Sequence, residues 1–556
     1  MSFPSQYIFV QLVLPLPSIM GLAIANDKSP SSPSLSSSSE ISNLTYGFAV
    51  IFLIWYFVVL SLAYLGVVEI FRKFNHSITD IATPPSSSSS SDLGSVEGVT
   101  IIRPLKGIDA QVESCLESSF VQYYPTSKLE VLFCVEDPKD PVIPIVETLI
   151  DKYPNIDARL MIGDPNNPDH YGPNPKINNL AKGFVAAKHD IIWVMDSNVW
   201  ASNGTLLRSV HALHHSLDNG RQTYDRRTGQ GKPVKVVHHL PLAVSLKSSQ
   251  LLMGPSWWSN IGSKLDEVFL KTSHAKFYVG FDRWAVAPCV NGKSNLYRRS
   301  DIDMAVQHIG RGQMPSVDGE SGDLSKDAAY YGSTKGYGIR YFSKFIGEDN
   351  MIAIALWDIG GRTGLTGDCV IQPLGNRNSS IKDYILRRSR WLRVRKYMVL
   401  AATILEPTTE SIVAGIYGTF AVSVLFFQQK FSISWLFFHF IVWYLTDYLQ
   451  FALLLKYSAA EDSRIMNSSN YIRPFFTEPD YNRFFDLELL LHSPRWSRFN
   501  KSGFTRQCFR VLVWSFYWFM REILAFPIWV YAMVGTTIDW RGRPFIIKSD
   551  LTAEEM

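Results

Sequence analysis

Leu129-Glu-Val-Leu-Phe-Cys-Val135 is a short apolar run that ends at the acidic pair Glu136-Asp137. Its length and its β-branched and aromatic side chains are typical of a buried strand. Ile191-Ile-Trp-Val-Met195 is a second run of this kind, and Asp196 follows it directly. The two runs predict a sheet in which acidic side chains stand just beyond the ends of buried strands.

The chain around these runs alternates between strand and helix patterns. We expect further strands at residues 99–102, 158–162, 236–244 and 339–346, and helices at 114–122, 142–152, 176–187, 248–271 and 351–357. This alternation predicts an α/β fold with a mostly parallel sheet and helices on both faces. Ligands of such sheets bind beyond the carboxyl ends of the strands. Asp137 and Asp196 both fall at that edge.

The bulk composition narrows the class of protein. A chain of 556 residues can form one large or two ordinary domains. Its net charge of +4 gives no case for nucleic-acid binding. The five cysteines are scattered and include no C-x-x-C, so they frame neither a disulfide scaffold nor a zinc site. We therefore expect the main domain to face a reducing compartment.

Residues 46–68 carry no charge and form the clearest membrane span. At 1.5 Å per residue they make about 34 Å of helix, which crosses the hydrocarbon of a bilayer. Arg72 and Lys73 follow, and the positive-inside tendency then puts the next domain in the cytosol. Residues 1–45 are expected to be a lumenal, partly disordered segment, and 69–98 a flexible linker.

The chain returns to the membrane after a main domain at residues 99–400. Residues 401–545 hold C-terminal membrane helices and a polar segment at 457–510, and 546–556 form a tail. Within them, 411–427 and 431–455 predict a helical hairpin, in which Asp447 should point into the bundle. Residues 511–538, with Arg521-Glu522, fit either one kinked span or an interfacial helix followed by a span. Residues 218–235 are expected to be a surface insertion, and 311–337 a second insertion or a mobile lid.

Two further motifs are candidates for catalysis and phosphate binding. Glu348-Asp349 offers a base or a ligand for a divalent cation, and Arg387-Arg-Ser-Arg390-Trp391 gathers guanidinium groups beside an indole. The planar fork of arginine pairs with two phosphate oxygens at once. The ordinary alternative is a salt-bridged helix pair near a membrane surface. Residues 387–396 hold six basic side chains, and we expect them to be attracted to an anionic membrane face.

The acidic residues fit a site for a nucleotide-diphosphate sugar. Asp137 is a candidate acceptor for a uracil N–H group, and Asp196 a candidate ligand for Mg²⁺ or Mn²⁺ shared with the diphosphate. Asp349 is a candidate base for the acceptor hydroxyl. A lone Asp at a strand end is more often a helix cap or turn residue. Ser197-Asn198 follows Asp196, so no second carboxylate stands beside it.

These motifs resemble those of the ceramide glucosyltransferases, a branch of the inverting GT-A-fold glycosyltransferases related to cellulose, chitin and hyaluronan synthases. The likeness runs from about residue 46 to 545 and rests on Arg103-Pro-Leu-Lys-Gly107, Cys134-Val-Glu-Asp137-Pro, Asn174-Pro-Lys-Ile-Asn-Asn-Leu180, Asp196-Ser-Asn198, Glu348-Asp349, Arg387-x-x-Arg390-Trp391, Arg521-Glu522, Pro527-Ile-Trp529 and Trp540-Arg541. It implies a GT-A-type, Rossmann-like domain. Arg387 stands where the processive synthases have Gln, which puts processivity in doubt.

The resemblance also implies roles for individual residues. Asp137 would bind uridine, Asp196 the metal and diphosphate, and Asp349 would be the base. Arg390 and Trp391 would hold the diphosphate and frame the acceptor. The remaining expected substrate contacts are Lys176 and Arg387, within the matching motifs, and His274 and Cys289, which match positions near the family's acceptor or inhibitor pocket. A solvated surface histidine and a core cysteine are the ordinary alternatives for the last two.

The expected function is transfer of glucose from UDP-glucose to the primary hydroxyl of ceramide, with inversion. The enzyme would be a multi-pass protein of the Golgi or ER membrane whose catalytic domain faces the cytosol. A processive polysaccharide synthase is one rival, although it needs more membrane helices and a Gln in place of Arg387. A catalytically inactive membrane scaffold is the other, and only the missing second carboxylate after Asp196 favours it.

Overall fold

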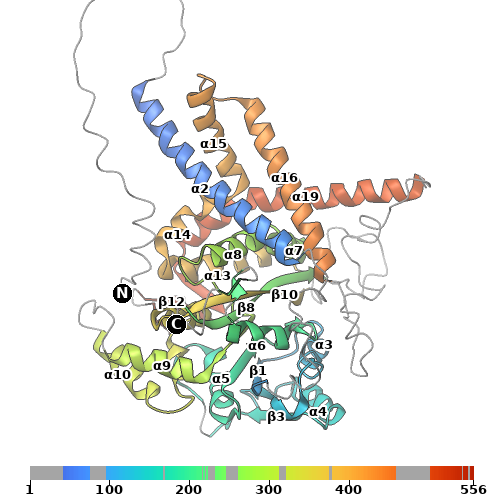
Figure 1. The fold of residues 1–556 in the computed structure, drawn as a ribbon, viewed down its shortest axis with the longest axis vertical. Coiled ribbons are helices and arrows are strands. Elements are labelled where there is room, and N and C mark those ends of the chain that lie inside the picture. Colours follow the sequence, from blue (N-terminus) through green and yellow to red (C-terminus); the bar gives the residue numbers. More distant parts are fainter. Residues whose placement is uncertain are drawn as a thin grey trace, which may run out of the picture.

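The computed structural model describes residues 42–74, 96–166, 169–215, 217–218, 221–222, 232–245, 261–311, 321–374, 379–458, 501–540, 543–548 and 551–556. They form an α/β domain and a group of long helices that rise from one side of it (Figure 1). Several expectations lie wholly or partly outside these ranges. They are the N-terminal segment, the linker after Phe74, most of the insertion at 218–235, the start of the helix expected at 248–271, and most of the polar segment at 457–510.

An eight-stranded sheet forms the centre of the α/β domain, in the order β3-β2-β1-β4-β9-β8-β10-β5. Its strands are β1 (Val99–Leu105), β2 (Leu129–Val135), β3 (Asp157–Ile162), β4 (Ile191–Met195), β5 (Trp200–Ala201), β8 (Val234–Ser245), β9 (Ser294–Arg298) and β10 (Arg362–Leu374). Pairs β1–β2, β2–β3, β1–β4 and β8–β10 are parallel, whereas β9 and β5 run antiparallel to their neighbours. The prediction of a mostly parallel sheet is confirmed, and β2 and β4 have the predicted bounds.

Two hydrophobic cores cover the two faces of the sheet because successive strand residues point to opposite sides. In β4, Ile192 and Val194 belong to one core, and Trp193 and Met195 to the other. Helices α5 (Pro175–Ala186), α9 (Arg299–Gly310), α10 (Ser321–Gly332), α11 (Gly338–Tyr341) and α12 (Glu348–Asp358) contribute to the first core. The second core includes α3 (Val112–Glu117), α4 (Ile143–Lys152) and α6 (Thr205–His215). Helices on both faces were predicted.

Residues 339–346 were predicted to be a strand, and that prediction is wrong. They form α11 and the 3-10 helix η3 (Phe342–Lys344) before Glu348. Tyr341 and Phe342 are consecutive and are both buried in the same core, whereas a strand would direct them to opposite faces. A short apolar run does not distinguish a strand from a buried helix.

Three other segments differ from expectation. The helix expected at 114–122 is the shorter α3, which ends at Glu117. Part of the segment at 311–337 is α10, whose Ala328 is fully buried in the core with α9, so this part is not a mobile lid. The chain from Thr537 onward contains a small antiparallel sheet of β11 (Thr537–Trp540), β12 (Arg543–Ile547) and β13 (Ala553–Glu555), so the end of the region expected at 401–545 to hold membrane helices forms strands together with the tail at 546–556.

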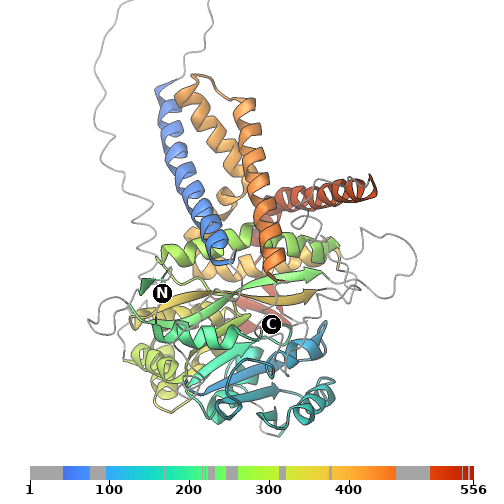
Figure 2. The same cartoon turned by 45° about the vertical axis from the view of Figure 1, so that its right-hand side comes forward.

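The helices that rise from the domain are α2 (Asn43–Phe74), α15 (Ser411–Phe426) and α16 (Ile433–Ser458) (Figures 1 and 2). A fourth long helix, α19 (Lys501–Val534), runs crosswise to them. Among the described residues, α2, α16 and α19 are long and apolar enough to cross a membrane. α15 passes that test together with α14 (Leu400–Leu405) and η4 (Glu406–Thr409), from which it is bent by 77°.

Buried charges inside the helix group are paired. Asp447 of α16 accepts a hydrogen bond from Trp518 Nε1 at 2.8 Å and lies 2.6 Å from Lys276 Nζ. The prediction that it points into the bundle is confirmed, as is the predicted hairpin of α15 and α16. Arg521 pairs with Glu522 and also with Glu410 at 3.0 Å.

Helices α7 (Ile261–Lys271), α8 (Ser273–Trp284) and α13 (Ile381–Met398) lie between the sheet and the membrane helices. α2 packs directly on α8 because Gly66 has no side chain. A Cβ atom at Gly66 would lie 1.8 Å from the carbonyl oxygen of Lys276. The first membrane helix is therefore fixed to the α/β domain.

Candidate active site

A cavity of about 2140 Å³ opens at the carboxyl edge of the sheet. Asp196 and Asp349 line it, and so do Ile51, Phe52 and Trp55 of membrane helix α2. The cavity therefore joins a charged region beside the sheet to an apolar region beside the membrane helices.

Asn174 holds the two helices that carry the charged residues. Its side-chain oxygen accepts hydrogen bonds from the backbone N–H groups of Lys176 (2.9 Å) and Ile177 (3.1 Å), so Asn174 is the N-cap of α5. Its side-chain nitrogen donates to the carbonyl oxygen of Phe345 (2.7 Å) and to Glu348 Oε2 (3.0 Å). One side chain thus joins the first turn of α5 to the start of α12.

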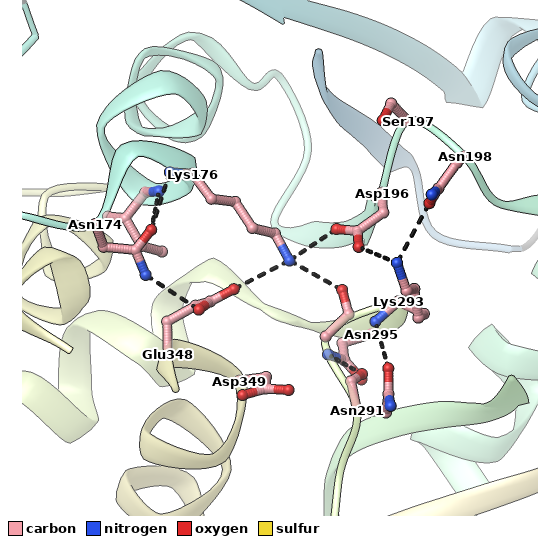
Figure 3. Close-up of polar contacts among 12 residues, drawn as sticks. Asn174, Lys176, Asp196, Ser197, Asn198, Asn291, Lys293, Asn295, Glu348 and Asp349 are labelled. Carbon is pink, nitrogen blue, oxygen red and sulfur yellow. Dashed lines mark hydrogen bonds and ion pairs between the residues drawn. The ribbon is translucent and has the colours of Figure 1, made fainter. Parts of the chain in front are cut away.

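Lys176 is the centre of the charged cluster (Figure 3). Its Nζ lies 2.8 Å from Asp196 Oδ1 and 3.0 Å from Glu348 Oε1, and donates to the carbonyl oxygen of Gly292 at 2.9 Å. Burial disfavours its charge, but Asp196 and Glu348 more than offset that effect and raise its pKa. Lys176 is therefore a permanent cation between two carboxylates.

Asp196 follows β4 and has a lysine on each oxygen. Lys293 Nζ lies 3.0 Å from its Oδ2 and donates to Asn198 Oδ1 at 3.3 Å. Burial opposes the charge of Asp196, but Lys176 and Lys293 hold its pKa well below the usual range. The carboxylate is ionised, and two ammonium groups add positive charge beside it.

The donor set around Asp196 fits a divalent cation only with help from a ligand. No group of three or more His, Cys, Asp and Glu side chains suited to a metal occurs in the described part of the chain. Asp196 and the amide oxygen of Asn198 offer oxygen donors, as Mg²⁺ and Mn²⁺ prefer. Mg²⁺ commonly binds through one or two carboxylates together with substrate phosphates and water. A cation here would need the diphosphate to complete its shell.

Asp349 differs from Asp196 in its surroundings. It lies in the first turn of α12, where its Oδ1 accepts the backbone N–H of Asn350 at 2.8 Å. Burial and the neighbouring Glu348 raise the pKa of Asp349 to about 7. A carboxylate with a pKa near the working pH suits a general base.

Gly292 keeps the space between Asp349 and Lys176 open. A Cβ atom at this position would lie 3.2 Å from Asp349 Oδ2 and 3.3 Å from Lys176 Nζ. Its backbone also supplies the carbonyl that Lys176 binds. The loop before β9 therefore shapes the part of the cavity next to the candidate base.

Arg390 and Trp391 of α13 line the same cavity. Their helix begins with a capping box, in which Ser380 and Asp383 bind each other's backbone N–H groups. Arg387 also lines the cavity and pairs with Asp266 of α7 (Ile261–Lys271).

The basic residues 387–396 were expected to be attracted to an anionic membrane face, but at least five of the six contact protein partners. Arg387 pairs with Asp266, Arg388 and Arg395 with Glu406, and Arg393 and Lys396 with backbone carbonyls at the end of α19. An arginine or lysine that is held by protein acceptors is not available to lipid phosphates. These basic side chains mainly form ion pairs and hydrogen bonds with other parts of the protein.

His274 and Cys289 also line the cavity. His274 stacks on Tyr278, with ring centroids 5.2 Å apart, and its Nδ1 is buried, so it is not a solvated surface residue. Burial, Arg388 and Arg395 lower its pKa to about 3. Burial raises the pKa of Cys289 to about 11. Both side chains are neutral at physiological pH and suit a polar but uncharged ligand group.

Asp137 is the one predicted site residue outside this group. It stands at the expected edge of the sheet, but it is exposed, and its Oδ1 accepts the backbone N–H of Lys139 at 2.8 Å. Its neighbour Glu136 lines the cavity, together with Lys106 and Asp109. The other eight predicted residues line one cavity: Lys176, Asp196, His274, Cys289, Asp349, Arg387, Arg390 and Trp391.

Three residues of the site were not predicted. Lys293 and Gly292 lie in a loop, and Glu348 was considered only as part of an acidic pair. Asn291-Gly292 is a turn signal in the sequence, but it does not indicate chemistry. The lysine pair on Asp196 is formed by residues 117 positions apart, which no local pattern reveals.

Comparison with known proteins gives a consistent result. Residues 53–219 and 334–466 match the model of the family described as "Glycosyl transferase family 21". A ceramide glucosyltransferase of Komagataella phaffii is 52% identical over 510 residues, covering 91% of this chain and 92% of that protein. One of Candida albicans is 46% identical, covering 91% and 97%. One of Gibberella zeae is 34% identical, covering 89% and 91%.

Proposed function

The chain belongs to glycosyl transferase family 21, and from that premise we propose that it transfers glucose from UDP-glucose to the primary hydroxyl of ceramide with inversion. The relatives that share about half of its residues are ceramide glucosyltransferases. Ceramide and a sugar donor are accordingly its substrates. UDP-glucose as the donor rests on the resemblance of the site motifs.

The observation that carries the proposal is the continuity of the cavity. Asp196, Lys176 and Asp349 line its charged end, and Phe52 and Trp55 of α2 line its apolar end. A sugar nucleotide is soluble in water, whereas ceramide is presented from the bilayer. A single cavity with these two ends brings the two substrates together.

The proposed reaction uses Asp349 as the base and the nearby cations to stabilise the leaving group. Asp349 accepts the proton of the primary hydroxyl as its oxygen attacks the anomeric carbon. A new carbon–oxygen bond to ceramide forms, and the bond between that carbon and the diphosphate oxygen breaks. Attack from the opposite face inverts the centre. Lys176, Lys293 and Arg390 offset the negative charge that develops on the leaving UDP.

The two adjacent carboxylates of α12 have separate roles. Glu348 is bound to Lys176 and to the Asn174 amide, so its position is fixed and its charge is compensated. Asp349 has no such cation within its hydrogen bonds and has the raised pKa. Glu348 therefore positions Lys176 and Asn174, and Asp349 is left to accept the proton.

Mg²⁺ or Mn²⁺ is part of the proposal, with Asp196 as its protein ligand and Asn198 beside it. When bound, the cation supplies additional positive charge to the diphosphate. Lys176 and Lys293 hold Asp196 in place and contribute positive charge of their own.

We place the enzyme in the Golgi or ER membrane with the α/β domain in the cytosol. Arg72 and Lys73 at the domain end of α2 support this orientation. The free cysteines Cys115, Cys134, Cys289 and Cys369 support a reducing compartment.

A product assay tests the function. The purified full-length protein in nanodiscs is given ceramide and, separately, UDP-glucose, UDP-galactose or UDP-N-acetylglucosamine. Glucosylceramide from UDP-glucose is the expected product. A polymer formed without ceramide would instead identify a polysaccharide synthase, and no product from any donor would identify an inactive scaffold. The comparisons favour neither rival.

A further inference from the structure

The long helix α19 changes partners along its length. Near its start, Trp514 packs against aromatic rings of α16, namely Tyr444, Tyr448 and Phe451. Further along, Arg521 pairs with Glu410, and Trp529 Nε1 donates to the Thr403 carbonyl of α14. The end of the helix is bonded to α13. Membrane helices in bundles mostly cross at angles of about 20°, so each stays beside its neighbours over many turns. This succession instead describes a helix that passes across the others, as Figures 1 and 2 show.

The C-terminal end of α19 is fastened to the α/β domain. The last carbonyls of a helix have no partner within it, and cations suit its negative end. Lys396 Nζ donates to the carbonyl oxygens of Met533 (2.8 Å) and Gly535 (3.3 Å). Arg393 donates to those of Tyr531 (3.2 Å) and Thr537 (2.7 Å).

The chain beyond α19 stays on the domain side. It continues into β11 and β12, where Phe545 packs in a small core with Ile346, just before the catalytic Asp349. α16 also ends on this side, because Gln450 donates to the carbonyl oxygens of Lys271 and Thr272, at the junction of α7 and α8.

One face of α19 is an exposed apolar stripe with no protein covering it in the described part of the chain. Leu512, Phe519, Ile523, Phe526, Val530 and Val534 form it, with exposed fractions of 40% to 80%. Their spacings of 7, 4, 3, 4 and 4 residues place them on one side of an α-helix. The other faces of α19 carry buried side chains, namely Trp514, Trp518, Arg521 and Glu522. The two charged side chains therefore point into the protein and not toward the medium that the apolar stripe contacts.

We propose that α19 does not cross the membrane but lies in the plane of the leaflet on the side of the α/β domain, with its apolar stripe among the upper acyl chains. Helices with one apolar and one polar face lie in membrane interfaces in this way, and in α19 contacts with the protein take the place of the polar face. The stripe extends over about 33 Å at 1.5 Å per residue, all at one depth. α2, α15 with α14, and α16 are then the crossing segments.

This placement gives α19 a role in the position of the active site. Tyr531 near its C-terminal end, and Thr537 to Asp539 just after it, line the cavity. α13, which carries Arg390 and Trp391, is bonded to that end. The depth of α19 in the leaflet therefore sets the height of the cavity relative to the lipid acceptor.

Depth measurement by spin labelling tests the proposal. Nitroxides are attached to single cysteines that replace Leu512, Ile523 and Val534 in the full-length protein in nanodiscs, and the signal of the wild-type chain is subtracted. We expect the three labels to lie at one depth within about 5 Å, one helical turn. Labels at Ile433, Ile441 and Leu449 on the exposed face of α16 are the control, and should differ by about 12 Å per step.

The opposite result is equally clear. A graded depth along α19, with Ile523 deepest and the two ends at opposite headgroup regions, would overturn the proposal. Glucosylceramide synthesis by each labelled variant shows that it is folded, and the depth reading does not depend on which sugar donor is used.

A second measurement of the topology does not use spin labels. A C-terminal epitope in sealed vesicles should be digested from the same side as the α/β domain, and protection of the epitope from that side would contradict the in-plane helix.

Discussion

The ammonium nitrogen of Lys176 lies 2.8 Å from Oδ1 of Asp196. This contact joins the first turn of α5 to the end of β4, the edge at which a parallel sheet binds ligands. Lys176 also contacts Glu348 of α12, so three elements of the domain meet at one cation. The charge of the site is thereby fixed before any substrate arrives.

Lys176→Met should abolish activity and reduce stability. The change leaves the buried carboxylate of Glu348 and the partly exposed carboxylate of Asp196 without their shared cation. Breaking a fully buried ion pair typically costs about 3–5 kcal/mol, so the loss at this partly exposed cluster should be smaller. Thermal unfolding and glucosylceramide formation measure the two effects. Lys182→Met is the matched control on the same helix, since Lys182 pairs only loosely with Asp169 at 3.4 Å. Equal losses in both variants would contradict the central role of Lys176.

Asp349→Asn should reduce the turnover by a factor of about 10² to 10⁴, the usual contribution of general base catalysis. The protein should still insert into membranes and bind UDP. Asp358→Asn, at the exposed end of the same helix, is the control and should retain activity. Retained activity in the Asp349 variant would remove the assigned base.

The raised pKa of Asp349 also predicts the pH dependence. The base is ionised above about pH 7, so the turnover should fall as the pH falls through that value. Stability has the opposite trend. A carboxyl group whose pKa is raised in the folded state stabilises the fold at low pH, and that contribution is lost as the pH rises through about 7. Asp349→Asn should therefore be more stable than the wild type at pH 8, while the two converge near pH 4.

The sequence predicted those features that depend on local pattern. β2 and β4 are uninterrupted apolar runs ended by acidic residues, and each lies in the sheet as expected. The run at 339–346 was assigned wrongly because apolar content alone does not specify backbone geometry. Its helical form is selected by tertiary contacts, including the Asn174 bond to the Phe345 carbonyl.

Charge placement was harder to predict than the strands. The basic residues of α13 resemble a membrane-binding stretch in sequence, but Arg393 and Lys396 meet the end of α19, about 140 residues later in the chain. Lys293 reaches Asp196 in the same way, from a distant loop. Partners so far apart in sequence become visible only when the chain is folded.

Gly292→Ala should lower the turnover at least about tenfold with little change in thermal stability. The added methyl group would lie 3.2 Å from Asp349 Oδ2 and 3.3 Å from Lys176 Nζ, in the space next to the base. A displacement of about 1 Å in a reacting group can cost a hundredfold in rate. Gly47→Ala, where a Cβ meets nothing within 4 Å, is the control for an added methyl group. Full activity of the Gly292 variant would show that this space is not used by substrate.

Arg393→Ala should destabilise the protein by about 1.5–3 kcal/mol, because hydrogen bonds from a charged donor contribute on that scale. The guanidinium donates to the carbonyl oxygens of Tyr531, in the last turn of α19, and of Thr537, in β11, and lies 4.7 Å from the centroid of the Tyr531 ring. Differential scanning calorimetry in nanodiscs measures the loss. Lys382→Ala, in the exposed first turn of the same helix, should have no effect. A wild-type melting temperature for the Arg393 variant would show that α13 does not hold α19.

UDP together with Mn²⁺ or Mg²⁺ should raise the melting temperature more than UDP with a chelator. A ligand at 100 times its dissociation constant stabilises the folded state by about 2.7 kcal/mol, so the shift is measurable. Asp196→Asn should remove the metal-dependent part of the shift, because Asp196 is the carboxylate placed to share the cation with the diphosphate. Lys176 and Lys293 occupy its oxygens before the nucleotide binds, so the metal alone should have little effect. If UDP stabilises the protein equally with and without the chelator, the two lysines supply the positive charge by themselves and the metal is not needed.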